Sequence, residues 1–163
     1  MPDKTWVAGD VVTAADTNTY LTHTGGQWVS FTPTLYQSNT LSVSVTNTVT
    51  KARYFRAGRM IHFEIVLAVT GTGTAANLVG VTLPVNAATT GTAINGNCLI
   101  YDTSANLFYA GLPVLFSGTV SIMTFLSTSA AASSDPRLGI AAFTAAFANT
   151  DAIAVSGSYE AAS

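Results

Sequence analysis

Carboxylates able to do acid–base chemistry are few in this chain and scattered along it. Glycoside hydrolysis, for example, needs two carboxylates about 5–10 Å apart around the scissile bond. The chain has eight: Asp3, Asp10, Asp16, Glu64, Asp102, Asp135, Asp151 and Glu160. Only Glu64 lies in the middle of an expected strand, and aspartates in loops are mostly turn formers. We therefore expect no hydrolytic pair and no enzymatic activity.

A nucleophilic mechanism also lacks its parts. It needs a serine or cysteine with a base and an orienting acid, and the sequence has no Gly-x-Ser-x-Gly motif. Cys98 lies in an apolar stretch, where a cysteine behaves as a small hydrophobe. His62 and Glu64 fall on one face of an expected strand, but Met60 and Val66 share that face. This arrangement favours a polar pair partly covered at an interface, and we predict no catalytic residue.

Motifs for cofactors and metals are missing as well. The glycine-containing stretch 70–74 lacks the lysine of a phosphate-binding loop, and no helix is expected after it. The two histidines, His23 and His62, lie far apart in the sequence, which argues against a structural zinc site. We predict neither a cofactor nor a metal ion.

The densest charge feature is basic. Four of the six Lys and Arg residues fall within nine positions: Lys51, Arg53, Arg56 and Arg59. They indicate either a surface for an anionic partner or a solvated hairpin that turns at Ala57-Gly58. Because the net charge is −2, the chain has no overall basic field to hold nucleic acid. We therefore expect subunit or partner contacts through five residues, including ion pairs between subunits: Arg53, Arg56, Arg59, His62 and Glu64.

Charged residues make up only 9% of the chain, against about 25% in typical soluble domains. With 48% hydrophobic residues the chain is not disordered, and its length of 163 residues fits one domain. No run of about 20 apolar residues predicts a membrane span, and the N-terminus does not resemble a signal peptide. A surface with so few charges is expected to be covered by copies of the same chain or by another protein.

From Gln27 onward the pattern is β throughout. Apolar and polar residues alternate at 41–49 and 61–67, which indicates strands with one buried face. About ten short strands are expected, at 28–36, 41–49, 53–55, 61–67, 78–83, 93–101, 107–116, 120–126, 138–147 and 152–159. Asn95-Gly96 is either a hairpin turn or part of one longer strand. The spacing predicts an all-β, jelly-roll-like antiparallel sandwich over residues 27–163.

Residues 1–26 differ from the rest and form an expected attachment arm. Thr13 with Asp16 resembles a capping box, which predicts two helical turns at about 14–21. A helix this short is not stable alone, so the arm must dock on its own domain or on a neighbour. Aromatic residues near the junction either pin the arm to the domain or form a platform for sugars: Trp6, Tyr20, Trp28, Phe31 and Tyr36.

The opening of the chain follows the pattern W-x-x-G-D-x-V-T-A-A-D-x-N, which is met by Trp6, Gly9, Asp10, Thr13, Asp16 and Asn18. Four further stretches belong with it: WVSFTP at 28–33, ARYFRAGRMIHF at 52–63, VTLPV at 81–85 and SGSYE at 156–160. Together these stretches resemble a family of small structural proteins of tailed bacteriophages, especially those of actinobacterial hosts.

The resemblance implies a virion protein, assembled in the host cytoplasm, with an N-terminal attachment arm and a β-sandwich that is usually trimeric. Such proteins are head decoration or head-fibre proteins bound to the major capsid protein, or minor tail proteins. The resemblance supplies no catalytic residues. We expect a trimeric capsid decoration protein; the alternative is a tail or baseplate protein that binds a host glycan.

Overall fold

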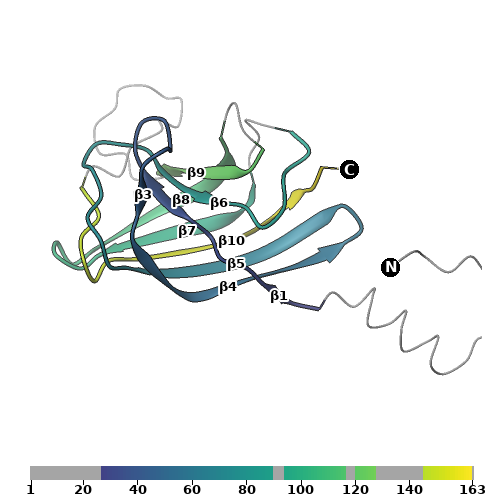
Figure 1. Ribbon diagram of the computed structural model, residues 1–163, viewed down its shortest axis with the longest axis horizontal. Coiled ribbons are helices and arrows are strands. Elements are labelled where there is room, and N and C mark those ends of the chain that lie inside the picture. Colours follow the sequence, from purple (N-terminus) through teal and green to yellow (C-terminus); the bar gives the residue numbers. More distant parts are fainter. Residues whose placement is uncertain (1–26, 90–93, 117–119, 128–144, 163) are drawn as a thin grey trace, which may run out of the picture.

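Figure 1 shows the computed structural model, which describes residues 27–89, 94–116, 120–127 and 145–162. The expected arm of residues 1–26, with its helix at 14–21, lies outside the described residues. So does most of the strand expected at 138–147; its last residues, 145–147, are described and are not in a strand.

Every strand of the described chain belongs to one antiparallel sheet. The strands are β1 (Val29–Ser30), β2 (Leu35–Gln37), β3 (Ser44–Val45), β4 (Asn47–Ala57), β5 (Met60–Val69), β6 (Val79–Thr82), β7 (Asn95–Asp102), β8 (Leu107–Leu115), β9 (Ile122–Ser127) and β10 (Ala152–Glu160). Their order across the sheet is β1-β4-β5-β10-β7-β8-β9-β6-β2-β3. The all-β fold expected from the sequence is confirmed.

The sheet curls so that β6 and β9 lie above β5 and β10 in Figure 1, and the two halves form the layers of the sandwich. β3 and β4 stand near opposite ends of the strand order, yet only Thr46 separates them in the chain. The carbonyl of Thr46 accepts hydrogen bonds from the N–H groups of Thr70 and Gly71, both at 2.9 Å. The chain therefore bends from one layer into the other at Thr46.

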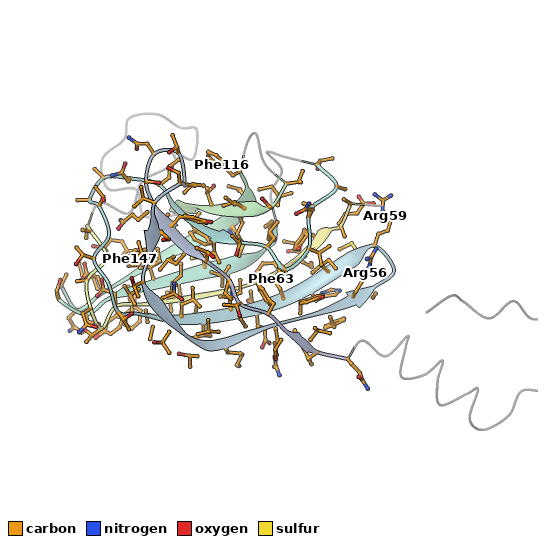
Figure 2. The ribbon with its side chains drawn as sticks, in the orientation of Figure 1. Arg56, Arg59, Phe63, Phe116 and Phe147 are labelled. Atoms are coloured by element: carbon orange, nitrogen blue, oxygen red, sulfur yellow. The ribbon has the colours of Figure 1, made fainter. Side chains whose placement is uncertain are left out.

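Side chains alternate across β5, as the sequence predicts. Ile61, Phe63, Ile65 and Leu67 are buried between the layers, and Figure 2 shows Phe63 and Phe147 there. The facing half of the sheet contributes Leu35, Val45, Val79, Val81 and Met123. Burying one such side chain contributes roughly 1.5–3 kcal/mol, so this contact between the layers is the main stabilising feature of the domain.

A fully buried amide, that of Gln37, lies within this apolar core. Its Nε2 donates to the carbonyl of Ala145 at 2.8 Å, and its Oε1 accepts from the N–H of Phe147 at 2.9 Å. A buried polar group with these partners avoids the penalty of an unsatisfied one. Gln37 thereby attaches the segment at 145–147 to β2, far away in the sequence.

Two aspartates serve as turn formers, as expected. Asp102 accepts hydrogen bonds from the N–H of Ala105 at 2.9 Å and from the hydroxyl of Ser104 at 2.7 Å. These bonds hold the pKa of Asp102 below its ordinary value, because they stabilise the ionised carboxylate. Asp151 accepts from the N–H groups of Thr103 at 2.9 Å and Ala148 at 2.8 Å.

The prediction of one continuous strand at 41–49 is wrong. Leu41 has a φ of 52° and lies in the loop between β2 and β3, where its side chain is buried. Val43 in the same loop is exposed. Further along, the pairing of β4 with β5 shifts register between Val49 and Lys51. Hydrogen bonds from the N–H groups of residues 42 and 43 to the hydroxyl of Ser38 hold the loop. A folded loop thus buries Leu41 without a strand.

The structure also corrects the strand expected at 28–36 and decides between the two alternatives for Asn95-Gly96. The strand expected at 28–36 is two strands, β1 and β2, because Pro33 has no N–H to continue a ladder. Asn95-Gly96 is not a turn but lies inside β7. There Gly96 is paired with Gly157 of β10, and a Cβ at Gly96 would clash with the backbone carbonyl of Ser156. The glycine allows close approach of two backbones.

Candidate functional site

The outward face of the sheet brings together several polar residues, two of them predicted contact residues. Antiparallel register places Arg53 of β4 opposite Glu64 of β5. Glu64 also lies opposite Ser156 of β10, which in turn lies opposite Asn97 of β7. We call these four residues the polar row. It crosses four neighbouring strands, so it is built by long-range pairing and not by any local motif.

The charges of the polar row are paired within the chain. Glu64 Oε2 accepts a hydrogen bond from Arg53 Nε at 3.0 Å and forms ion pairs with Arg53 Nη2 at 2.8 Å and Lys51 Nζ at 3.6 Å. Ser156 and Asn97 are joined by a hydrogen bond of 2.9 Å between their side chains. Because all three charged side chains are partly exposed, these pairs contribute little to stability, about 0–1 kcal/mol each.

Aromatic rings border the polar row on one side. The guanidinium carbon of Arg53 lies 4.3 Å from the ring centre of Trp28, a cation–π contact. The ring of Phe55 meets Trp28 edge-on at 4.9 Å and stacks on His62 at 4.6 Å. His62 and Glu64 lie on the same face, as predicted, but His62 contacts Phe55 and no hydrogen bond joins it to Glu64. His62 and Glu64 therefore do not contact each other as a pair; His62 contacts Phe55, and Glu64 contacts Arg53.

The other two predicted cations, Arg56 and Arg59, lie at the tip of the β4–β5 hairpin (Figure 2). The turn residues are Gly58 and Arg59, one position later than expected, and Gly58 takes the left-handed φ of 61° that such a turn requires. Arg56 Nε donates to the carbonyl of Gly58 at 2.7 Å. Arg59 forms an ion pair of 3.2 Å with Glu160. The structure therefore gives carboxylate partners within the chain to three cations of this region: Lys51, Arg53 and Arg59.

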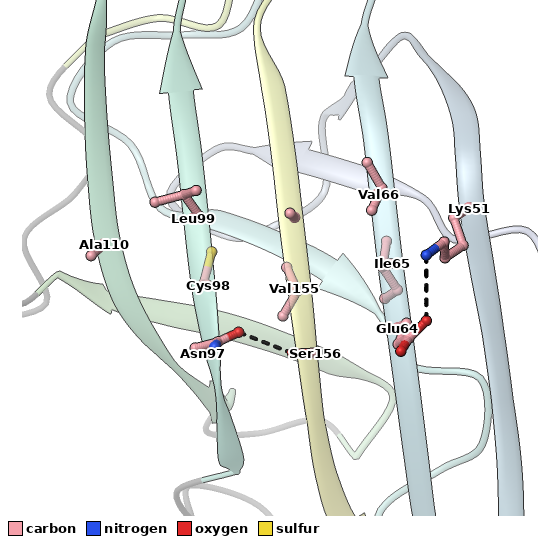
Figure 3. A pocket seen from close by; sticks show the side chains of 11 residues that line it. Lys51, Glu64, Ile65, Val66, Asn97, Cys98, Leu99, Ala110, Val155 and Ser156 are labelled. Carbon is pink, nitrogen blue, oxygen red and sulfur yellow. Dashed lines mark hydrogen bonds and ion pairs between the residues drawn. The ribbon is translucent and has the colours of Figure 1, made fainter.

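A shallow depression of about 490 Å³ lies beside the polar row (Figure 3). It follows a second row across the strands, in which register aligns Lys51, Val66, Ala154, Leu99 and Ala110. Its floor is low because the central strand, β10, carries only small outward side chains here. The depression has an ion pair at one end and apolar side chains at the other.

The apolar end continues into a group of exposed hydrophobic residues on β7 and β8. Leu99 is 42% exposed, Phe108 64% and Leu112 40%. The ring of Phe108 stacks on that of Tyr101 at 4.5 Å, which holds it against the sheet. We call these four residues the apolar patch. No charged side chain lies at an outward position of β7 or β8.

Sequence reasoning missed the apolar patch, although a signal for it exists. β8 reads LFYAGLPVL and is apolar at almost every position, in contrast to the alternating pattern of β5. A strand with that pattern is typical of a sheet that is covered on both faces. In the described chain nothing covers the outward face of β8.

The remaining groups with potential reactivity are buried or form turns. Cys98 is buried, and its burial raises the pKa of the thiol above the ordinary value. Asp102 and Asp151 form turns, as described above. The described residues contain no group of three His, Cys, Asp or Glu that would hold a metal ion. They also contain no helix long and apolar enough to cross a membrane.

The chain matches no protein-family model, no curated protein and no solved structure. The interpretation of the outward face therefore depends on its own residues and geometry.

Proposed function

We propose that this chain is a non-enzymatic structural protein of a bacteriophage virion. In this proposal residues 1–26 attach the protein to the particle, and the β domain assembles with copies of itself, as a homotrimer. The major capsid protein is the partner of the arm, and the whole is a capsid decoration or head-fibre protein. The observation that carries the proposal is the pattern at residues 6–18, placed directly before a β domain that begins near Gln27.

The β domain has properties that support this proposal. It has its own core between two layers, so it does not need the arm to bury its apolar side chains. Its outward face carries an apolar patch that no described residue covers, which suits assembly with a partner. Its densest basic cluster is largely neutralised by Glu64 and Glu160, which favours protein contacts over nucleic acid.

The alternative is a minor tail or baseplate protein that binds a host glycan. The observation that favours it is the depression beside the polar row, where Glu64, Ser156 and Asn97 offer hydrogen-bonding groups next to an apolar floor. Sugars present hydroxyl groups and apolar ring faces, so they fit a surface of mixed character.

Copy number in purified virions, measured by quantitative mass spectrometry, distinguishes the two. A number comparable to that of the major capsid protein supports the decoration proposal. A number as low as that of tail-tip proteins favours the alternative, and absence from the particle contradicts both.

The arm is tested by removing residues 1–26. We expect the truncated protein to remain folded and self-associated but to be lost from virions, because the β domain keeps its core and loses only its attachment. The control is the full chain expressed in the same complementation system. Incorporation of the truncated protein at the level of the full chain would show that the arm is not the attachment segment.

A further inference from the structure

We propose that the apolar patch on β7 and β8 is the contact between copies of this chain, and that Leu99 and Phe108 of one copy enter the depression of another. This inference rests on the self-association included in the proposed function and identifies the surface that performs it. It assigns the outward faces of β10, β7 and β8 to the subunit interface.

The first step of the argument is the exposure of the patch. Leu99, Phe108 and Leu112 stand on two paired strands, and the register places Leu99 opposite Ala110 and Tyr101 opposite Phe108. The patch is therefore contiguous and not a scatter of single apolar residues. Contiguous exposed apolar surface on a soluble domain usually marks an interface. Aromatic enrichment and depletion of charge are also typical of interface centres.

The second step concerns the partner's charge. The outward positions of β7 and β8 offer no charged group that could pair with a charged partner. A partner rich in Lys, Arg, Asp or Glu would leave its own charges desolvated and unpaired over the patch. A second copy meets the requirement, because it presents the same uncharged strands. Only 9% of the residues in the chain are charged, which agrees with a surface that is covered by copies of the same chain.

The third step is shape. The patch stands higher because Phe108 and Leu112 are large and exposed, whereas the adjacent depression, which Leu99 borders, is low because Ala154 and Ser156 are small. A protrusion and a depression lie side by side on one face, so each copy can insert into a neighbour and receive a neighbour. A two-fold arrangement makes this contact reciprocal, and a head-to-tail arrangement gives a closed ring when the rotation between copies closes. The stack of Tyr101 on Phe108 holds the protruding ring in place before contact.

The test is the mass of the purified full-length chain in sedimentation velocity over a range of concentrations. Phe108→Glu and Leu99→Lys place a charge on the protrusion, and Ala154→Trp fills the depression. We expect the wild type to be oligomeric and each variant to raise the dissociation constant at least tenfold. The matched control is Val43→Glu, which adds a charge at a residue that is 57% exposed in the loop between β2 and β3. It should assemble like the wild type.

Thermal unfolding and circular dichroism show whether each variant is folded, and Ala154→Trp and Phe108→Glu act from opposite sides of the contact. A monomeric wild type at the highest concentration overturns the inference. So does an oligomer that all three variants leave intact. Binding of host cell-wall polysaccharide by a monomeric wild type, lost in Ala154→Trp, would also overturn it and assign the depression to a glycan.

The outcome is separable from that of the proposed function. An oligomer that depends on Phe108 but is absent from virions contradicts the virion proposal and leaves this inference standing. A monomer that is still incorporated into virions contradicts this inference and the self-association in the proposed function, and leaves the attachment to the virion standing.

Discussion

β5 and β8 belong to the same sheet and lie three places apart in the strand order, yet the side chains on their outward faces differ in polarity. The inward side chains of β5 are buried, and its outward side chains include His62 and Glu64, which have partners on β4. β8 also turns one face inward, but its outward face holds the exposed residues Phe108 and Leu112. Among the described residues, polar side chains on the outward face of β5 have partners, whereas the apolar ones on the outward face of β8 stay exposed.

The difference indicates how the domain divides its apolar residues between two tasks. Those on the inner face of β5 hold the two layers together. Those on the outer face of β8 contribute nothing to this contact, because they point away from the other layer. No described part of the chain covers them, which is why we propose the subunit contact there and not on the charged rim of β4.

The largest expected effect separates these two tasks directly. Phe63→Ala removes a buried ring between the layers and should lower the free energy of unfolding by about 3–5 kcal/mol, through lost burial and the cavity left behind. Phe108→Ala removes an exposed ring of the same type and should change the stability of the dilute monomer by no more than about 0.5 kcal/mol. Urea unfolding followed by tryptophan fluorescence measures both.

The dependence of the unfolding midpoint on protein concentration is the second test of this comparison. Assembly stabilises the folded state by mass action, so the unfolding midpoint of the wild type should rise with protein concentration. This rise should be lost in Phe108→Ala. Equal destabilisation by the two substitutions in dilute solution would mean that the two faces of the sheet do not divide the tasks as described.

The local pattern of the sequence predicts the inward set of β5 and the hairpin at 53–63 well, because both depend on residues close together in the chain. It also places His62 and Glu64 on one face correctly. It does not predict that Arg53 is paired with Glu64 while Ser156 is paired with Asn97, since these contacts depend on which strands become neighbours. Strand order is set by packing across the whole domain and not by local alternation.

The errors have the same origin. Asn95-Gly96 has the composition of a turn, but pairing with Gly157 of the C-terminal strand keeps it extended. The stretch 41–49 alternates like a strand, but a loop anchored by the hydroxyl of Ser38 buries Leu41 and leaves Val43 exposed. In both places a contact distant in the sequence, or a side chain outside the pattern, outweighs local preference.

A smaller effect concerns the turn that holds β7 and β8 together. In Asp102→Asn the side chain keeps its size but loses the charge that strengthens the bonds from Ala105 and Ser104. We expect a loss of about 0.5–1 kcal/mol at pH 7. Because the folded-state pKa of Asp102 is lowered, its contribution is present above the unfolded pKa of about 4 and lost as the pH falls through the folded value.

The measurement is the difference in unfolding free energy between the wild type and Asp102→Asn at pH 7 and at pH 3, which removes the contribution of the other acids. The difference should shrink at pH 3. A difference that stays constant with pH would show that the turn depends on the shape of the side chain and not on its charge. The mass of the assembly at pH 7 then reports whether loosening this turn also weakens the contact through β8.

The smallest expected effect tests the boundary between the charged rim and the apolar patch. Glu64→Gln leaves Lys51 and Arg53 without their carboxylate at the edge of the depression, whereas Glu160→Gln breaks the similar pair with Arg59 at the hairpin tip. Both pairs are partly exposed, so each substitution should cost less than about 1 kcal/mol of stability. Their effects on assembly should differ, because only Glu64 borders the proposed contact.

Sedimentation velocity at low and high salt measures that difference. Uncompensated positive charge from two copies repels across the contact, so Glu64→Gln should weaken assembly two- to fivefold at low salt and less at high salt, where the repulsion is screened. Glu160→Gln should assemble like the wild type at both salt concentrations. An equal effect of the two substitutions would move the contact away from the depression and toward the hairpin, where Arg56 and Arg59 would become the residues to test.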